Sequence, residues 1–188
     1  DAQGAWTAPA GVALGHRRLS ILELSPAGAQ PMESASGRFV MVYNGEVYDH
    51  LELREALGSG LRWRGRSDTE SLLAAFEAFG VEETLRRVAG MFAFALWDRE
   101  RDELTLGRDR LGEKPLYYGW QAGVFLFGSE LKALKRHPAF RFETDPRALA
   151  LFLKYGYLPA PWTIYAGVRK LLPGHVLRLS TAEPVGAA

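Results

Sequence analysis

A continuous apolar run, residues 91–97, limits the fold of this chain more than any other segment does. Successive side chains of a β-strand point to opposite faces, so a strand without polar residues is expected to be buried on both faces. The large side chains of Phe92, Phe94 and Leu96 share one face, whereas Ala93 and Ala95 lie on the other. Small alanines let a second layer approach closely. The run therefore predicts a central strand in a layered fold.

The other segments alternate between strand-like and helix-like patterns, which favours an α+β fold with sheets packed face to face and helices outside. The predicted strands are residues 11–15, 38–43, 91–97, 103–107, 116–120, 124–128, 163–165 and 175–179. The predicted helices are residues 50–57, 67–79, 81–88 and 129–136, and one that begins at Asp145. At 188 residues, one domain is the default expectation.

Helix-start signals support two of these helices. Ser67 and Glu70 form a capping-box pattern, in which each side chain bonds an orphan backbone N–H at the helix start. The apolar residues of that helix recur on one face and Gly80 ends it; they are Leu72, Leu73, Phe76 and Phe79. Ser129 is expected to cap the helix of residues 129–136.

A late helix has its own start signal. Asp145 is a good N-cap residue, and Pro146 suits the first helical position because its missing N–H is not needed there. The helical spacing of Leu149, Phe152 and Leu153 predicts that these three side chains point inward.

Composition excludes several classes of function. With 23 basic and 22 acidic residues the net charge is +1, which favours neither nucleic acid nor an anionic membrane as a partner. No apolar run approaches the roughly 20 residues of a membrane span, and no signal peptide is recognisable. The chain contains no cysteine, so it offers no disulfide, no thiolate metal site and no cysteine nucleophile. A cytoplasmic location is the resulting expectation.

Familiar catalytic motifs are also missing from the sequence. It has no glycine-rich phosphate loop and no serine in a nucleophile elbow, and its four histidines are too far apart for a local metal motif. Asn44 and Gly45 follow an apolar strand, and their side-chain amide and backbone N–H could form an oxyanion hole. Asn-Gly after a strand is more often a simple hairpin turn, and that alternative stays open here.

Five motifs occur in order along the chain: 15–21 (GHRRLSI), 43–48 (YNGEVY), 67–70 (SDTE), 90–95 (GMFAFA), and 108–118, which runs from RDRLG to PLYY. Together they resemble the glutaminase domain of class II glutamine amidotransferases, most closely that of glutamine-hydrolysing asparagine synthetase. The resemblance extends to residues 157–161 and 172–175. Each motif alone is weak, whereas five in register are specific.

The resemblance implies a four-layer αββα sandwich of two mainly antiparallel sheets, the N-terminal-nucleophile hydrolase type. In that family the first residue is a cysteine whose own α-amine acts as general base; such an amine has a pKa of about 7.7–8.0. Residues 1–4 read as the middle of a loop and align after the family's first strand, so that strand and the cysteine are expected to be absent. The unpaired sheet edge this would leave is a liability.

The resemblance also assigns roles to particular residues. Arg18 matches the arginine that pairs with the glutamine carboxylate, and Asp68, with Glu46 nearby, matches the carboxylate that takes the ammonium group. Asn44 and Gly45 match the oxyanion hole. The segment that lines the substrate site is matched by Leu19, Ser20 and Ile21. Simpler readings remain: Arg18 as a surface arginine, Asp68 as an acid complementing a helix dipole, and Glu46 as a solvent-facing residue.

The family resemblance implies that residues 1–180 are a truncated glutaminase domain and residues 181–188 a linker to an absent synthetase domain. Glutamine would be hydrolysed to glutamate and ammonia, and the ammonia used to convert aspartate to asparagine. No cofactor is expected in this domain, whereas ATP and Mg²⁺ are expected in the synthetase domain. Without its cysteine, the chain as given is expected to be inactive.

Three questions stay open at this stage. The chain could be a non-catalytic module like that of β-lactam synthetases, which keep the fold without the nucleophile. It could also belong to an amidotransferase with another acceptor, such as a sugar phosphate or a phosphoribosyl donor. A homodimer of the parent protein is a further option that the sequence does not decide.

Overall fold

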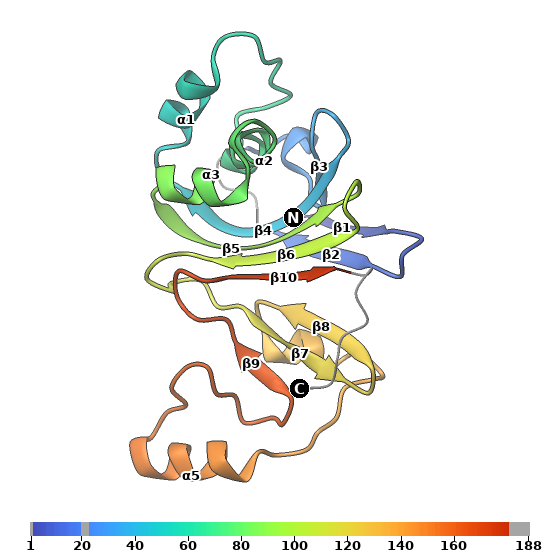
Figure 1. Ribbon diagram of the computed structural model, residues 1–188, viewed down its shortest axis with the longest axis vertical. Coiled ribbons are helices and arrows are strands. Elements are labelled where there is room, and N and C mark those ends of the chain that lie inside the picture. Colours follow the sequence, from blue (N-terminus) through green and yellow to red (C-terminus); the bar gives the residue numbers. More distant parts are fainter. Residues whose placement is uncertain (1, 20–22, 181–188) are drawn as a thin grey trace. The chain divides into compact units, whose positions relative to one another are not determined.

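The computed structural model describes residues 2–19 and 23–180 (Figure 1). The chain divides into two compact units, each described here by itself. The first unit comprises the chain up to Leu106 together with the segment from Leu177, and the second comprises Gly107–Val176. In the described part of the chain, no helix is both long and apolar enough to cross a lipid bilayer.

The first unit is built on a five-stranded sheet with the strand order β10-β6-β5-β4-β3. The strands are β3 (Met32–Glu33), β4 (Phe39–Val47), β5 (Gly90–Asp98), β6 (Glu103–Arg108) and β10 (Val176–Ser180). Strand β5 lies at the centre, and its residues from Phe92 to Asp98 are all buried. The apolar run thus forms the central, doubly buried strand that its composition predicts.

Three helices cover one face of this sheet: α1 (His50–Leu57), α2 (Asp68–Phe79) and α3 (Val81–Arg87) (Figure 1). Their apolar side chains join those of β4 and β5 in one hydrophobic cluster. Phe76 of α2 packs on Phe94 of β5 with 5.2 Å between ring centroids. Burial of each such aromatic side chain stabilises the fold by roughly 1.5–3 kcal/mol. The predicted inward face of α2 is therefore confirmed.

The start of α2 differs in one detail from the capping-box prediction. Ser67 Oγ accepts the N–H of Glu70 at 3.2 Å, as expected. The Glu70 carboxylate instead accepts the N–H groups of Arg64 at 2.8 Å and Gly65 at 3.0 Å. Its acceptors thus hold the segment before the helix, because that segment folds back over the first turn.

The prediction that residues 1–4 form a loop is wrong for residues 2–4, and residue 1 lies outside the described residues. Strand β1 (Ala2–Thr7) pairs antiparallel with β2 (Ala13–Arg18) in a separate two-stranded sheet. Strand β2 also begins later than the predicted residues 11–15. Gly11 belongs to the turn between β1 and β2, where its N–H donates to the carbonyl of Ala8 at 3.1 Å. Residues 2–7 lack an alternating pattern, so only their pairing with β2 reveals the strand.

The second unit contains a three-stranded antiparallel sheet with the order β8-β7-β9. Its elements are β7 (Tyr117–Gln121), β8 (Val124–Gly128), β9 (Val168–Lys170), α4 (Leu131–Leu134) and α5 (Pro146–Tyr155). The N-cap of α4 is Glu130, not the predicted Ser129. The sequence predicts a strand at residues 163–165, but the strand of this region is β9, which begins at Val168. Thr163 Oγ1 instead bonds the backbone of Tyr165 and Val168, so residues 163–165 belong to a turn.

Helix α5 starts as predicted, with Asp145 accepting the N–H of Arg147 at 2.9 Å. Its predicted inward face is wrong. Leu149, Phe152 and Leu153 are 42%, 45% and 77% exposed, whereas Ala148 is fully buried. Ala148 is the one buried residue of this helix, and the larger apolar side chains are turned outward.

Candidate active site

Strand β4 does not end where the sequence suggests. It runs on to Val47 because β5 continues opposite it, with Asn44 facing Ala93 and Gly45 facing Phe92 in the antiparallel register. Asn44 and Gly45 are therefore inside a strand, and the hairpin-turn alternative is excluded.

The backbone of β4 presents alternate N–H groups to opposite edges. On the edge away from β5, Met41 pairs with Met32 of β3. Beyond it, the Tyr43 N–H donates to Oε1 of Gln30 at 2.7 Å, and the Val47 N–H donates to Oδ2 of Asp68 at 2.9 Å. Gly45 lies two residues from both Tyr43 and Val47, so its N–H points to the same edge of β4. No strand among the described residues pairs with β4 at this position.

Gly45 also has a purely steric reason to be glycine. A Cβ atom at this position would lie 2.1 Å from the carbonyl oxygen of Met91 and 2.5 Å from Cα of Phe92. Real Cβ atoms do not approach backbone so closely, so β4 and β5 come together here only because the side chain is absent. The close packing fixes the position of the Gly45 N–H within the sheet.

Asp68 is the first residue of α2 and is only 6% exposed. Its Oδ2 accepts the Tyr43 hydroxyl and the Val47 N–H, both at 2.9 Å, and Oδ1 accepts the Thr69 N–H at 2.9 Å. A carboxylate has about four lone-pair directions, so one more donor can be accommodated. Burial, together with the adjacent Asp68 carboxylate, raises the pKa of Tyr43, which therefore stays a hydroxyl donor. Asp68 thus joins α2 to the edge of β4 that faces away from β5.

Asn44 and Glu46 have the opposite orientation to their neighbours. Side chains alternate along a strand, so Asn44 and Glu46 share one face of β4, and Tyr43 and Val47 share the other. Tyr43 and Val47 are in the buried cluster beneath the helices, whereas Asn44 and Glu46 are half-buried. Asn44 therefore places a side-chain amide next to the backbone donor that follows it.

Arg18 lies at the end of β2 and is held by backbone carbonyl groups. It donates to the carbonyl of Ser25 at 3.0 Å and to that of Glu23. A Cβ on Gly28 would be 2.3 Å from its guanidinium, so that glycine leaves room for it. These contacts differ from the exposed ion pair of the surface-arginine alternative. They use part of a five-donor group and leave other N–H groups for an anion.

The remaining predicted residues of this segment are less informative. Leu19 follows Arg18 and is 77% exposed. Ser20 and Ile21 lie outside the described residues, so their predicted role stays a prediction.

Strand β2 brings Arg18 towards the other site residues. His16, two positions earlier on the same face, bonds the carbonyl of Tyr43 through Nε2 at 3.0 Å. The structure thus joins β2, β4 and the start of α2, which carry Arg18, the Asn44–Glu46 segment and Asp68. Those three stretches are far apart in the sequence.

Glu23 was not among the residues selected from the sequence. Its carboxylate accepts the Ser25 N–H at 2.9 Å and the Arg66 N–H at 2.8 Å, so it connects the loop that holds Arg18 with the segment before α2. Hydrogen bonds from Ser25 and Arg66 lower the pKa of Glu23 to about 2. No sequence signal marks this residue, since both of its partners depend on the fold of two loops.

The depressed pKa predicts how this connection responds to acid. Because the folded-state pKa of Glu23 is lowered from 4.5 to about 2, its stabilising contribution is present above about pH 4.5 and is lost as the pH falls towards 2. We expect the carboxyl carbon of Glu23 to titrate in NMR spectra with a midpoint near pH 2. The Arg66 amide should shift with the same midpoint, and a midpoint near 4.5 for both would contradict the connection.

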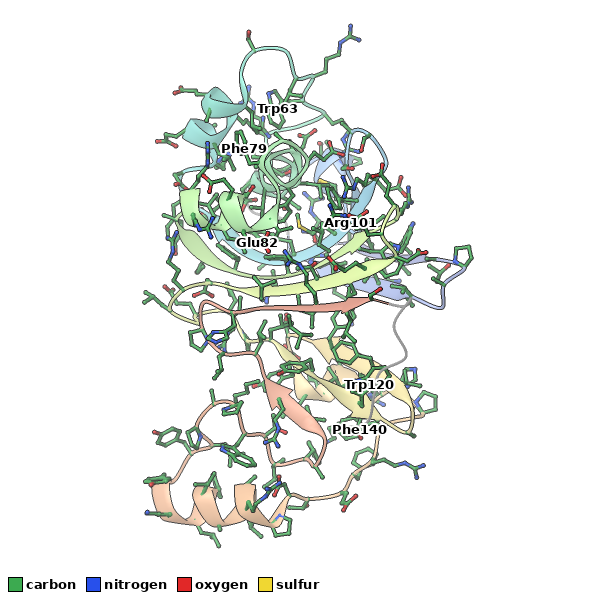
Figure 2. All side chains as sticks on the ribbon, viewed as in Figure 1. Trp63, Phe79, Glu82, Arg101, Trp120 and Phe140 are labelled. Carbon is green, nitrogen blue, oxygen red and sulfur yellow. The ribbon has the colours of Figure 1, made fainter. Side chains whose placement is uncertain are left out.

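Arg54 is a second residue that sequence reasoning missed. It donates to Ser71 Oγ at 2.6 Å and to the carbonyls of Gly65 and Ser67, each at 3.0 Å. Its guanidinium lies over the ring of Trp63 at 4.0 Å, on the segment between α1 and α2 (Figure 2). Burial lowers the pKa of Arg54. These contacts anchor the segment that leads into α2 and so help to place Asp68.

Within the described residues, no group of three or more histidine, cysteine, aspartate or glutamate side chains could hold a metal ion. What the site offers chemically is an oriented guanidinium, a buried carboxylate with spare acceptor capacity, and two amide donors next to each other on β4. Such a set suits a small zwitterion with a polar carbonyl group.

Comparison with known proteins gives a consistent picture. A family model described as a glutamine amidotransferase domain matches residues 1–185. An asparagine synthetase (glutamine-hydrolysing) of Bacillus subtilis is 36% identical over 173 residues, which is 90% of this chain and 28% of that protein. A putative asparagine synthetase of Mycobacterium tuberculosis is 38% identical over 95% of this chain and 29% of its own length. This chain thus spans less than a third of either relative.

Two further comparisons broaden this result. An amidase of Gibberella zeae, chry2, is 35% identical over 94% of this chain and 26% of its own length. Among solved structures, the glutamine phosphoribosylpyrophosphate amidotransferase of Bacillus subtilis, complexed with ADP and GMP, superposes with a TM-score of 0.54. That match covers 65% of this chain and 28% of the other at 24% identity, and so bears on the fold alone.

Proposed function

This chain belongs to the family of class II glutamine amidotransferase domains, which have the α+β fold of N-terminal-nucleophile hydrolases, and on that premise we propose that it is the glutaminase part of an asparagine synthetase. Its proposed reaction is the hydrolysis of L-glutamine to glutamate and ammonia. The proposal is supported by the family match together with relatives whose names include glutamine hydrolysis.

One observation carries the proposal on the structural side. The Gly45 N–H points to an edge of β4 that no described strand covers, between two N–H groups that already have side-chain acceptors. The Asn44 side chain adjoins it. A pair of fixed amide donors at such an edge is what the oxyanion of a tetrahedral intermediate requires.

The residues divide the work as follows. Arg18 binds the α-carboxylate of glutamine, and Asp68, with Glu46 nearby, binds the α-ammonium group. A thiolate attacks the side-chain amide carbon, and the carbonyl oxygen becomes an oxyanion that accepts hydrogen bonds from Asn44 and Gly45. The amide nitrogen then takes up the proton that the thiol gave up and leaves as ammonia, and water cleaves the resulting thioester to release glutamate. We assign the thiolate to a cysteine outside these 188 residues, because they contain none.

The further steps of the proposal concern the parent protein. Ammonia passes to a synthetase domain in cis, where ATP and Mg²⁺ activate aspartate for conversion to asparagine. The glutaminase domain itself needs no cofactor in this scheme. A cytoplasmic location is part of the same proposal. These steps are supported by the names of the relatives, which are much longer than this chain.

A non-catalytic module is the second candidate, and a full-length protein whose mature chain does not begin with cysteine would favour it. The two candidates differ in one measurable property. Glutamine-dependent release of glutamate by the full-length protein supports the glutaminase, whereas glutamine binding without hydrolysis supports the module.

Arg18→Lys in the full-length protein tests the binding scheme. Lysine keeps the charge but loses the planar pair of donors, and a hydrogen bond to a charged group contributes about 1.5–3 kcal/mol. We therefore expect the KM for glutamine to rise about 10–150-fold, with a smaller change in kcat. Arg17→Lys, at the exposed neighbouring position, serves as the matched control. Equal KM values for the two variants would remove Arg18 from the substrate site.

A further inference from the structure

We propose that Gln30 and His16 are positioning residues that end the pairing of β3 with β4 and thereby keep the Gly45 N–H open for the oxyanion. The inference rests on the proposed function and extends it to two residues outside the predicted site. Neither side chain needs to touch the substrate, because both act through the backbone of Tyr43.

The register of the sheet shows what these residues replace. Met32 faces Met41 and Glu33 faces Val40 in the antiparallel ladder. Continued by two residues, the same register would bring the backbone of Gln30 opposite Tyr43. Continued by two more, it would bring residue 28 opposite Gly45, where a carbonyl could take the Gly45 N–H. A regular extension of β3 would therefore block the oxyanion donor.

Two side chains make the bonds that the backbone of Gln30 would have made. In a hydrogen-bonded antiparallel pair, each residue donates its N–H to the other's carbonyl. Here the Tyr43 N–H donates to Oε1 of Gln30 at 2.7 Å. The Tyr43 carbonyl is bonded by Nε2 of His16 at 3.0 Å. Both backbone groups of Tyr43 are thus satisfied although no strand of the described residues pairs with β4 there.

The main chain of residues 28–31 is directed elsewhere. The carbonyl of Gln30 faces β1, where a Cβ atom on Gly4 would be only 2.2 Å from it. Pro31 has no N–H to donate to a ladder. Gly28 closes the short helix η1 (Pro26–Gly28) and packs against the Arg18 guanidinium, so it is not opposite Gly45. Because the β3–β4 ladder ends here, the Gly45 N–H is left uncovered by β3 and Gly28 can pack against Arg18.

The state of His16 agrees with this role. A carbonyl oxygen only accepts, so Nε2 carries the proton and Nδ1 is the unprotonated nitrogen. Nδ1 is buried and has no hydrogen-bond partner within the described part of the chain. Burial lowers the pKa of His16 and keeps it in this neutral form. The side chain is therefore a fixed donor to Tyr43.

The test uses the full-length protein and three glutamine variants. Gln30→Leu removes the acceptor, whereas Gln30→Glu retains an oxygen at the same reach. Gln121→Leu is the matched control, because Oε1 of Gln121 also accepts a backbone N–H, that of Arg141 at 2.8 Å, in the other unit. Steady-state glutamine hydrolysis, the melting temperature of each variant and ammonia-dependent synthesis are measured together.

We expect Gln30→Leu to lower kcat for glutamine hydrolysis about 10–100-fold, less than the loss of an oxyanion donor itself, with KM changed less than threefold. Gln30→Glu should recover most of kcat, and ammonia-dependent synthesis should be unchanged. The inference is overturned if Gln30→Leu keeps kcat within threefold, if Gln121→Leu loses as much, or if Gln30→Glu fails to recover kcat.

A second measurement covers the case in which Gln30→Leu does not fold. In His16→Gln the amide can still donate to the Tyr43 carbonyl, so kcat should remain within a few fold of wild type, whereas His16→Leu should resemble Gln30→Leu. Equal kcat values for the two His16 variants would overturn the inference. A wild-type protein that does not hydrolyse glutamine would instead contradict the proposed function.

Discussion

Asn44→Ala in the full-length protein is expected to lower kcat for glutamine hydrolysis by about 10²–10³-fold, because one of two oxyanion donors is lost. The donor acts mainly on the transition state, so KM for glutamine should change little. Ammonia-dependent synthesis does not use this site and should survive. The measurement is a parallel assay of both activities at saturating ATP and aspartate.

Two further variants make the Asn44 result specific. Asn44→Asp keeps the shape of the side chain but has no amide donor, so it should be as impaired as Asn44→Ala. Val42→Ala shortens a side chain on the same face of β4 and should keep nearly full glutaminase activity. Gly45→Ala is unsuitable, since a Cβ there collides with the backbone of β5. Equal loss of both activities in Asn44→Ala would sink the assignment.

Asp68→Ala should reduce both stability and glutamine binding. It leaves the Tyr43 hydroxyl and the Val47 N–H without their acceptor in a buried site. Each unsatisfied buried group costs about 1–3 kcal/mol, so we expect the free energy of unfolding to fall by roughly 2–6 kcal/mol. Urea denaturation followed by circular dichroism measures this change.

Tyr43→Phe is the matched control for Asp68. It removes one donor to the carboxylate without stranding the Val47 N–H, and is expected to cost only about 0.5–1.5 kcal/mol. Glutamine binding should persist in Tyr43→Phe and fail in Asp68→Asn, whose amide carries no charge for the ammonium group. If Asp68→Asn bound glutamine as tightly as wild type, Asp68 would be a structural residue only.

The segments with strong local signals were predicted well. The run at residues 91–97 became the central strand β5, and α2 runs from its Ser67 cap to Gly80 as its apolar spacing indicated. In both cases the pattern is dense enough that one burial arrangement satisfies it. Residues 2–7 lack such a pattern, and their strand depends on the partner β2.

Helix α5 shows a different limit. Its cap and spacing predicted a helix with Leu149, Phe152 and Leu153 inward, and the helix is present with those side chains outward. Periodicity identifies which residues share a face. It does not say whether the unit around the helix covers that face, since this depends on what packs nearby.

The class of this protein and the types of side chain in its candidate site follow from motifs that occur in order along the chain. Sequence motifs and apolar periodicity are local properties, so they can be recognised in the amino-acid sequence without the fold. Only the folded structure shows that Asn44 and Gly45 lie inside a strand and that the Gly45 N–H points to an edge that no described strand covers. It also shows the hydrogen bonds of Gln30 and His16 to Tyr43, and those of Glu23 and Arg54 to the segment before α2. Hydrogen bonds between segments far apart in the chain have no local signature, because each needs a partner that only the folded register provides.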